Sequence, residues 1–276
     1  MATVAYQGEP GAFSEQAARK FFGVGAPLKP CTSFNDVFAS VSRGSSRFGV
    51  VPTENSVFGS IHQNYDLLLK HKLIIVGEVI LRIQLHLMSL PGVGLTNIRS
   101  VYSQPQALGQ CEEFLRMLKG VQPIAFQDTA GSARMISEER RKDSAAIASS
   151  SAARIYGLRI LRRNVESNHK NFTRFVVLSR KQGLVPRKGK TSLVFATKNV
   201  PGTLFQALAG FAHHGCNLVK IESRPLMGRP WEYLFYLDVE GTLREEPLRN
   251  ALNHLEELST FMRVLGTYRK GKTYSS

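Results

Sequence analysis

The chain has 276 residues, of which 43% are hydrophobic, and a formal net charge of +15. This length favours two domains over one. The longest apolar run, residues 73–90, is interrupted by Glu78, Arg82 and His86, which excludes a membrane-spanning helix there. Basic residues are spread along the chain without interleaved aromatic residues, so we expect no nucleic-acid and no membrane partner. A cytoplasmic protein is expected, or a plastid protein if a transit peptide has been removed.

Residue types that commonly bind metals are scattered along the chain. Cys31, Cys111 and Cys216 lie far apart and form no Cys-x-x-Cys pair. Of the seven histidines only His213 and His214 are neighbours, and adjacent helical residues point about 100° apart. No glycine loop has a recognised phosphate-binding spacing. We therefore expect no metal and no cofactor.

Strand-like runs alternate with amphipathic helical runs over the first two thirds of the chain. Predicted strands cover residues 4–6, 48–51, 101–103, 124–126 and 145–148. Predicted helices begin near residue 13, cover residues 61–70 and 105–119, and begin again at residue 129. This alternation predicts an α/β fold with mostly parallel strands and crossover helices.

The composition and pattern of the sequence change at residues 180–191, which have no hydrophobic periodicity and contain two glycines, a proline and five basic residues. We interpret this stretch as a linker. Beyond it the pattern predicts a strand at 192–196, a helix at 203–213, strands at 218–222 and 231–239, a helix at 246–258 and a strand at 262–265. This βαββαβ order is that of the ferredoxin-like split unit.

Four loops that follow predicted strands are rich in small polar residues: 7–14, 52–60, 103–107 and 128–133. In parallel α/β sheets, ligands bind at the carboxyl ends of strands, where helix N-termini present unpaired N–H groups. For any one loop, helix capping by Ser14, Ser103 or Thr129 is an equally good explanation. The four loops together favour a ligand site.

A fifth segment, residues 171–175, places Thr173 between Phe172 and Phe175 ahead of an apolar run. A threonine among aromatic residues is also common in ordinary strands. These five segments, in this order, resemble the prephenate dehydratase family over nearly the whole chain. Residues 173–175 (Thr-Arg-Phe) resemble the family signature, and the resemblance implies that Thr173 is catalytic with Phe175 beside it.

Further motifs resemble the substrate pocket of that family: residues 54–56 with 59–60, the turn at 106–108, and residues 129–131. One departure is Gln104, where the family commonly has a histidine. The resemblance implies that the substrate is bound by Ser14, Asn55, Ser56, Gly59, Ser60, Gln106, Ala107, Thr129, Ala130 and Gly131.

After the linker, residues 202–205 and 222–225 resemble the two effector motifs of ACT domains. The resemblance implies effector binding by Gly202, Thr203, Leu204, Asn217, Leu218, Glu222, Ser223, Arg224 and Pro225. It implies a two-lobed catalytic domain like a type II periplasmic-binding protein at 1–180, with lobes at about 1–80 plus 166–180 and at 81–165. A linker at 181–191 and a ferredoxin-like ACT regulatory domain at 192–270 complete the expected organisation.

The implied activity is that of a hydro-lyase that removes water and carbon dioxide from prephenate to give phenylpyruvate in L-phenylalanine biosynthesis. The resemblance also implies a homodimer or homotetramer with L-phenylalanine as allosteric effector. In this mechanism the Thr173 hydroxyl donates to the departing hydroxyl, Asn55, Ser56 and Thr129 bind carboxylates, and Phe175 covers the ring. Arg174 should point away from Thr173 because successive strand residues alternate between faces.

Two alternatives remain at this point. The first is an arogenate dehydratase, because residues 60–66 resemble plant members of that type as well as some bacterial dehydratases. The second is a non-catalytic amino-acid sensor built from a binding-protein fold and an ACT domain. The complete motif around Thr173 argues against the sensor.

Overall fold

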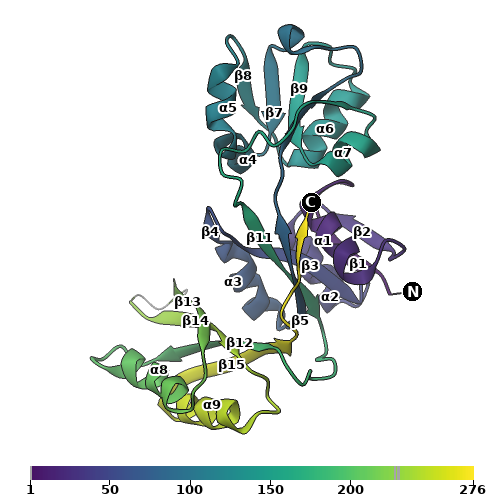
Figure 1. The fold of residues 1–276 in the computed structure, drawn as a ribbon. Helices are drawn as coiled ribbons and strands as arrows, with labels where there is room; N and C mark the ends of the chain where they lie inside the picture. The colour runs from purple at the N-terminus through teal and green to yellow at the C-terminus, as the bar shows by residue number, and fades with distance from the viewer. Residues whose placement is uncertain (1, 227, 229–230) are drawn as a thin grey trace. The chain divides into compact units, whose positions relative to one another are not determined.

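The computed structural model describes residues 2–226, 228 and 231–276, and its contacts divide them into two compact units (Figure 1). The first unit holds residues 2–67, 79–176 and 272–276. The second holds residues 68–78 and 177–271. The chain therefore passes back and forth between the units instead of completing one before it starts the other. Among the described residues, no helix is both long and apolar enough to cross a membrane.

The first sheet has the strand order β16-β5-β11-β3-β1-β2, and β4 pairs with β3. β1 runs parallel to β2 and β3, and β16 runs parallel to β5. The helices α1 (Phe13–Phe22) and α2 (Phe34–Ser42) pack against β1 and β3, and α3 covers His62–His71. The strands are β1 (Val4–Gln7), β2 (Leu28–Cys31), β3 (Phe48–Asn55), β4 (Gly59–Ser60), β5 (Ile74–Arg82), β11 (Phe172–Ser179) and β16 (Thr273–Ser275).

The second sheet has the order β10-β6-β9-β7-β8. β7 is parallel to β8 and β9, whereas β6 is antiparallel to β9 and β10. Its strands are β6 (His86–Ser89), β7 (Ser100–Ser103), β8 (Gln122–Ala125), β9 (Ser144–Ala148) and β10 (Arg159–Arg162). The 3-10 helix η1 (Leu95–Asn97) and the helices α4 (Pro105–Gln110), α5 (Glu112–Met117), α6 (Thr129–Glu138) and α7 (Ser150–Ile155) belong to the same part of the chain.

The third sheet has the order β13-β14-β12-β15, and its strands pair antiparallel. The helices α8 (Thr203–His213) and α9 (Glu246–Leu258) lie side by side (Figure 1) and bury a core with Phe195, Phe211 and Leu237. The strands are β12 (Lys190–Thr197), β13 (Leu218–Pro225), β14 (Tyr233–Glu240) and β15 (Ser259–Tyr268). The predicted βαββαβ order is confirmed, and both helices have the predicted bounds.

Several predictions about single elements were wrong. The helix expected at 105–119 is two helices, because Cys111 has a φ of −108° and a ψ of 15° that are not helical. Residues 52–55, expected in a loop, continue β3. The second sheet mixes parallel and antiparallel pairs, so the expected mostly parallel arrangement does not hold there. The short strands β2, β10 and β16 were missed because their partly exposed residues give no clear alternation.

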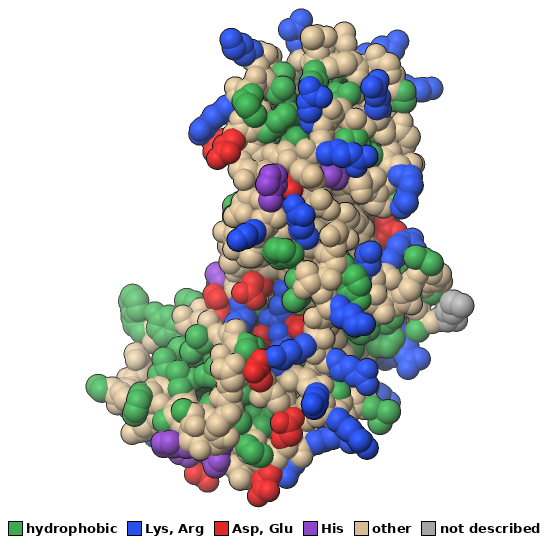
Figure 2. Space-filling model, viewed as in Figure 1, with side chains coloured by type: hydrophobic (Ala, Val, Ile, Leu, Met, Phe, Trp, Pro, Cys, Tyr) green, Lys and Arg blue, Asp and Glu red, His purple; other side chains and the backbone are tan. Residues whose placement is uncertain are grey.

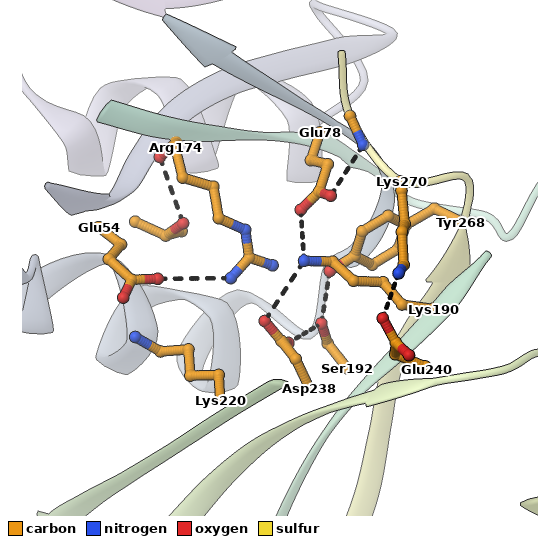
Figure 3. A network of polar contacts seen from close by, with 12 residues as sticks. Glu54, Glu78, Arg174, Lys190, Ser192, Lys220, Asp238, Glu240, Tyr268 and Lys270 are labelled. Atoms are coloured by element: carbon orange, nitrogen blue, oxygen red, sulfur yellow. Dashed lines mark hydrogen bonds and ion pairs between the residues drawn. The ribbon is translucent and has the colours of Figure 1, made fainter. Parts of the chain in front are cut away.

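Basic side chains are scattered over the visible face of the molecule and are not gathered into one stripe (Figure 2). Three buried charged groups of the second unit are paired with one another. Lys190 on β12 places its Nζ 2.7 Å from Glu78 Oε2 and 3.6 Å from Asp238 Oδ2 (Figure 3). These three side chains are 9%, 3% and 7% exposed, respectively.

Further hydrogen bonds complete this buried network within the second unit. Glu78 Oε1 accepts from Gly271 N at 2.8 Å. Ser192 Oγ donates to Asp238 Oδ1 and lies 2.5 Å from Tyr268 Oη (Figure 3). Buried charges are tolerated when they are both paired and hydrogen-bonded, and losing one partner leaves an uncompensated charge.

We therefore predict that Lys190→Met lowers the free energy of unfolding by about 3–5 kcal/mol, because the buried Glu78 and Asp238 carboxylates lose their ion pairs with Lys190. Urea unfolding of the wild type and the variant measures the difference. Lys270→Met is the matched control, since Lys270 pairs with Glu240 at an exposed position and such pairs contribute about 1 kcal/mol or less. Equal effects of the two substitutions would contradict the role given to burial.

Candidate active site

A pocket of about 470 Å³ in the first unit gathers residues from all four polar loops and from β11. It is of the size that small-molecule sites usually have. A larger cavity of about 700 Å³ in the same unit contains none of the predicted site residues. The predicted residues that line the smaller pocket are Ser14, Asn55, Gly59, Ser60, Gln106, Ala107, Thr129, Thr173 and Phe175.

Helix N-termini supply much of the pocket wall. The lining residues include the starts of α1 (Ala12, Phe13, Ser14), α3 (residues 61–63), α4 (residues 104, 106 and 107) and α6 (Asp128, Thr129). First-turn N–H groups have no acceptor inside their own helix, and the helix dipole gives that end a partial positive charge. The pocket can therefore bind anions through backbone groups.

Among the described residues that line the pocket there is no lysine and no arginine, and the ionisable side chains are His62 and Asp128. Another part of the pocket wall is apolar and includes the buried side chains of Ile83, Leu85 and Phe175. A ligand carboxylate in this pocket would thus be bound by neutral donors. A carboxylate that lies against the apolar wall would be poorly solvated.

The Thr173 side chain is fixed by a hydrogen bond between neighbouring strands. Asn55 at the end of β3 donates through Nδ2 to Thr173 Oγ1 at 2.9 Å and to Asn171 Oδ1 at 2.7 Å. Asn55 Oδ1 in turn accepts from Val57 N and Phe58 N. Because Thr173 Oγ1 is used as an acceptor, its own O–H remains to be donated, and the residue lines the pocket at 7% exposure.

This geometry changes the role expected for Asn55. Both of its Nδ2 hydrogens are engaged by Asn171 and Thr173, so they do not donate to a ligand carboxylate as the sequence suggested. Asn55 therefore fixes the position of the Thr173 side chain. Asn171, which was named only as the start of the motif, belongs to the same buried network.

Three predicted residues do not line the pocket but support it. Ser56 Oγ donates to Lys170 O and accepts from Phe172 N, both at 2.9 Å, and so fixes the start of β11. Ala130 and Gly131 are buried in the first turn of α6, where Gly131 N donates to Asp128 Oδ1 at 2.7 Å.

Arg174 lies outside the pocket, as strand alternation predicts for a residue between Thr173 and Phe175. Its guanidinium is 3.7 Å from Glu54 Oε2, and Thr53 Oγ1 lies 3.4 Å from its carbonyl oxygen (Figure 3). Arg174 therefore stabilises the pairing of β3 with β11 instead of clamping a ligand.

Sequence reasoning missed many lining residues. Some had a signal, because Gln7, Gly8, Gln104 and Asp128 stand within the polar loops that were singled out. Gln104, the departure from the family pattern, lines the pocket. Residues 61–63 also had one, because they belong to the segment 60–66 that resembles arogenate dehydratases. Most of the others had none, because they are apolar or lie outside the loops. The remaining lining residues are Ala12, Phe13, Phe34, Pro52, Phe58, Ile61, His62, Gln63, Ile83, Leu85 and Gln110.

The predicted effector residues lie in the second unit around the start of α8 and along β13. Gly202 adopts a left-handed conformation (φ of 84°) immediately before α8, and Thr203 Oγ1 donates to Lys198 O at 2.8 Å in that turn. Asn217 Nδ2 donates to Glu240 Oε2 at 3.2 Å. Leu218, Glu222, Ser223, Arg224 and Pro225 belong to β13, an edge strand of the third sheet.

Comparison with known proteins identifies the family of this chain. Residues 4–183 match the family model described as prephenate dehydratase. Arogenate dehydratase/prephenate dehydratase 2, chloroplastic, of Arabidopsis thaliana is 47% identical over 277 residues, which cover 96% of this chain and 72% of that protein. The chain belongs to the prephenate dehydratase family.

Solved structures of relatives have the same fold. Prephenate dehydratase from Arthrobacter aurescens, in complex with L-Phe, superposes with a TM-score of 0.89 at 31% identity and covers 97% of this chain and 90% of its own. A protein described as GqqA, a novel type of quorum quenching acylase, also has a TM-score of 0.89, at 37% identity, with 98% of each chain covered.

Proposed function

We propose that this protein is a hydro-lyase that converts prephenate to phenylpyruvate for L-phenylalanine biosynthesis, working in the cytoplasm or in a plastid. The observation that carries the proposal is the Thr173 hydroxyl, which accepts from Asn55 and so presents its hydrogen to a pocket lined by helix N-termini. The reacting ring is the same in arogenate, so the same chemistry serves arogenate as well.

The reaction breaks two bonds and makes an aromatic ring. The ring carboxylate leaves as carbon dioxide, its bonding electrons enter the ring, and the hydroxyl on the opposite carbon departs and gains a proton to become water. Aromatisation drives the reaction, so the protein has to position the ring and stabilise charge on the departing oxygen. The Thr173 O–H is the donor for that oxygen.

The composition of the pocket favours cleavage of the bond between the ring and its carboxylate. A carboxylate that is well solvated or paired with a cation keeps its electrons, whereas one held against apolar side chains releases them more readily. Ile83, Leu85 and Phe175 supply such a wall, and no lysine or arginine is found among the described lining residues. Helix N-termini are left to bind the side-chain carboxylate.

We predict that Thr173→Val lowers kcat by roughly 10²- to 10³-fold, the range typical for loss of one donor to a developing oxyanion. Valine keeps the shape of threonine but lacks the hydroxyl. Phenylpyruvate formation from prephenate and phenylalanine formation from arogenate are measured side by side, with Thr173→Ser as the control that keeps the donor.

Asn55→Asp adds a second test of the same hydrogen-bond direction. An ionised aspartate accepts where asparagine donates, so it would attract the Thr173 hydrogen away from the pocket and also lower kcat. Full activity of Thr173→Val would remove the hydroxyl from the mechanism. A wild-type protein that turns over neither substrate would favour the sensor alternative.

We predict that the activity survives exhaustive chelation and needs no added cofactor. The described residues contain no group of three or more His, Cys, Asp or Glu side chains placed to hold a metal. Initial rates before and after dialysis against EDTA are the measurement, with a zinc-dependent hydrolase treated in parallel as a control for chelation. Loss of activity that one added metal restores would contradict the prediction.

We also propose that the part of the chain after the linker is an ACT domain that binds L-phenylalanine as allosteric effector. Its βαββαβ sheet, the left-handed turn at Gly202 and the motif on β13 support this proposal. β13 is an edge strand with Val219 and Ile221 46% and 49% exposed, which suits pairing with a second copy in a homodimer or homotetramer. The related Arthrobacter aurescens enzyme is described in complex with L-Phe.

We predict that replacing Glu222, Ser223 and Arg224 together with alanine weakens inhibition by L-phenylalanine while uninhibited turnover stays close to wild type. Allosteric coupling is commonly about 1–3 kcal/mol, so the inhibition constant should rise by roughly 5- to 150-fold. Dose-response curves provide the measurement, and alanine at the exposed α9 residues Glu256 and Glu257 is the control. An unchanged curve for the triple variant would place the effector elsewhere.

A further inference from the structure

The acid in the pocket wall is not explained by the chemistry at Thr173. Asp128 lines the pocket and is half-buried there. A fixed negative charge disfavours a ligand that carries two carboxylates of its own, by Coulomb repulsion in a medium less polar than water. Asp128 must therefore either be neutralised by the protein or meet a positive charge on the ligand.

The protein satisfies only one of its two oxygens. Asp128 is the N-cap of α6, and its Oδ1 accepts from Gly131 N at 2.7 Å. Oδ2 has no hydrogen bond to any residue within 2–226, 228 or 231–276. Helix capping thus accounts for Oδ1, whereas Oδ2 can still accept a hydrogen bond from a ligand in the pocket.

The cation nearest to this region along α6 is already committed. Arg134 pairs with Glu9 at 2.9 Å and approaches Glu138 at 3.8 Å. Tyr156 stays neutral, because burial, followed by the charge of Glu9, raises its pKa to about 12, and its O–H donates to Pro10 O. Within the described part of the chain, no salt bridge to Asp128 is formed.

Asp128, which favours a cation, lies next to backbone N–H groups that favour an anion. Thr129, the first residue of α6, also lines the pocket, and the first-turn N–H groups of this ten-residue helix favour a carboxylate. An acceptor carboxylate and an anion-binding helix end, side by side, match the ammonium and carboxylate groups of an α-amino acid. A keto acid offers the same carboxylate but only an acceptor oxygen beside it.

We propose that Asp128 is the specificity-determining residue that favours arogenate over prephenate, by accepting a hydrogen bond from the substrate ammonium through Oδ2. This inference rests on the proposed function, since it assumes that the pocket carries out the dehydration. It adds that the amino form of the substrate is bound more tightly than the keto form, whose carbonyl oxygen faces the Asp128 carboxylate.

Asp128→Asn tests the proposal, because asparagine caps a helix as well as aspartate does and has the same shape but no charge. We expect kcat/KM for arogenate, divided by that for prephenate, to fall by roughly 10- to 100-fold, the effect of losing a hydrogen bond to a charged group. The value for prephenate alone should stay level or rise. Asp128→Ser, which also caps helices, provides a second uncharged variant if the asparagine variant folds poorly.

Asp36→Asn is the matched control. Asp36 belongs to the exposed capping box of α2, outside the pocket, and its replacement should leave the ratio unchanged. An equal loss for both substrates in the Asp128 variants, or an unchanged ratio, would reduce Asp128 to a helix cap and overturn the inference. A wild-type enzyme inactive on both substrates would overturn the proposed function itself.

Discussion

The hydrogen bond from Asn55 to Thr173 joins residues 118 positions apart, and the site depends on the pairing of β3 with β11 that makes it possible. The same pairing brings Ser56 against the start of β11 and keeps Arg174 on the opposite side with Glu54. Each of these contacts would change face if β11 shifted by one residue, because side chains alternate along a strand. The Thr173 hydroxyl is therefore positioned by the register of β11 against β3.

The electrostatic character of the site follows from the use of backbone groups. A protein with a net charge of +15 has many lysines and arginines, yet among the described pocket residues none is present. Helix ends offer anions fixed, partial positive charges in place of fully charged side chains. The charge of Asp128 matters in such a setting, because no lysine or arginine among the described lining residues offsets it.

The sequence was informative where local chemistry and structure coincide. Gly202 before α8 and the small residues that start α6 could be identified from their types and positions. The role of Asn55 could not, because its two donors are used by partners more than 100 residues away. Ile83 and Leu85 look like any apolar strand residues, and only the fold turns them into a pocket wall. The buried ion pair of Lys190 with Glu78 could not be predicted from the sequence either, since charged residues are usually exposed.

The return of β16 to the first sheet has a consequence for the synthesis of the protein. Tyr274 pairs with Leu81, so about 190 residues must be added after β5 before the last part of its edge, residues 80–82, is covered, which takes roughly 10 to 40 s on the ribosome. During that time β5 presents unpaired backbone groups, and such an edge is a template for pairing with other chains. A fragment that stops before residue 272 keeps this open edge permanently, so self-association, more than loss of any catalytic group, would limit its use.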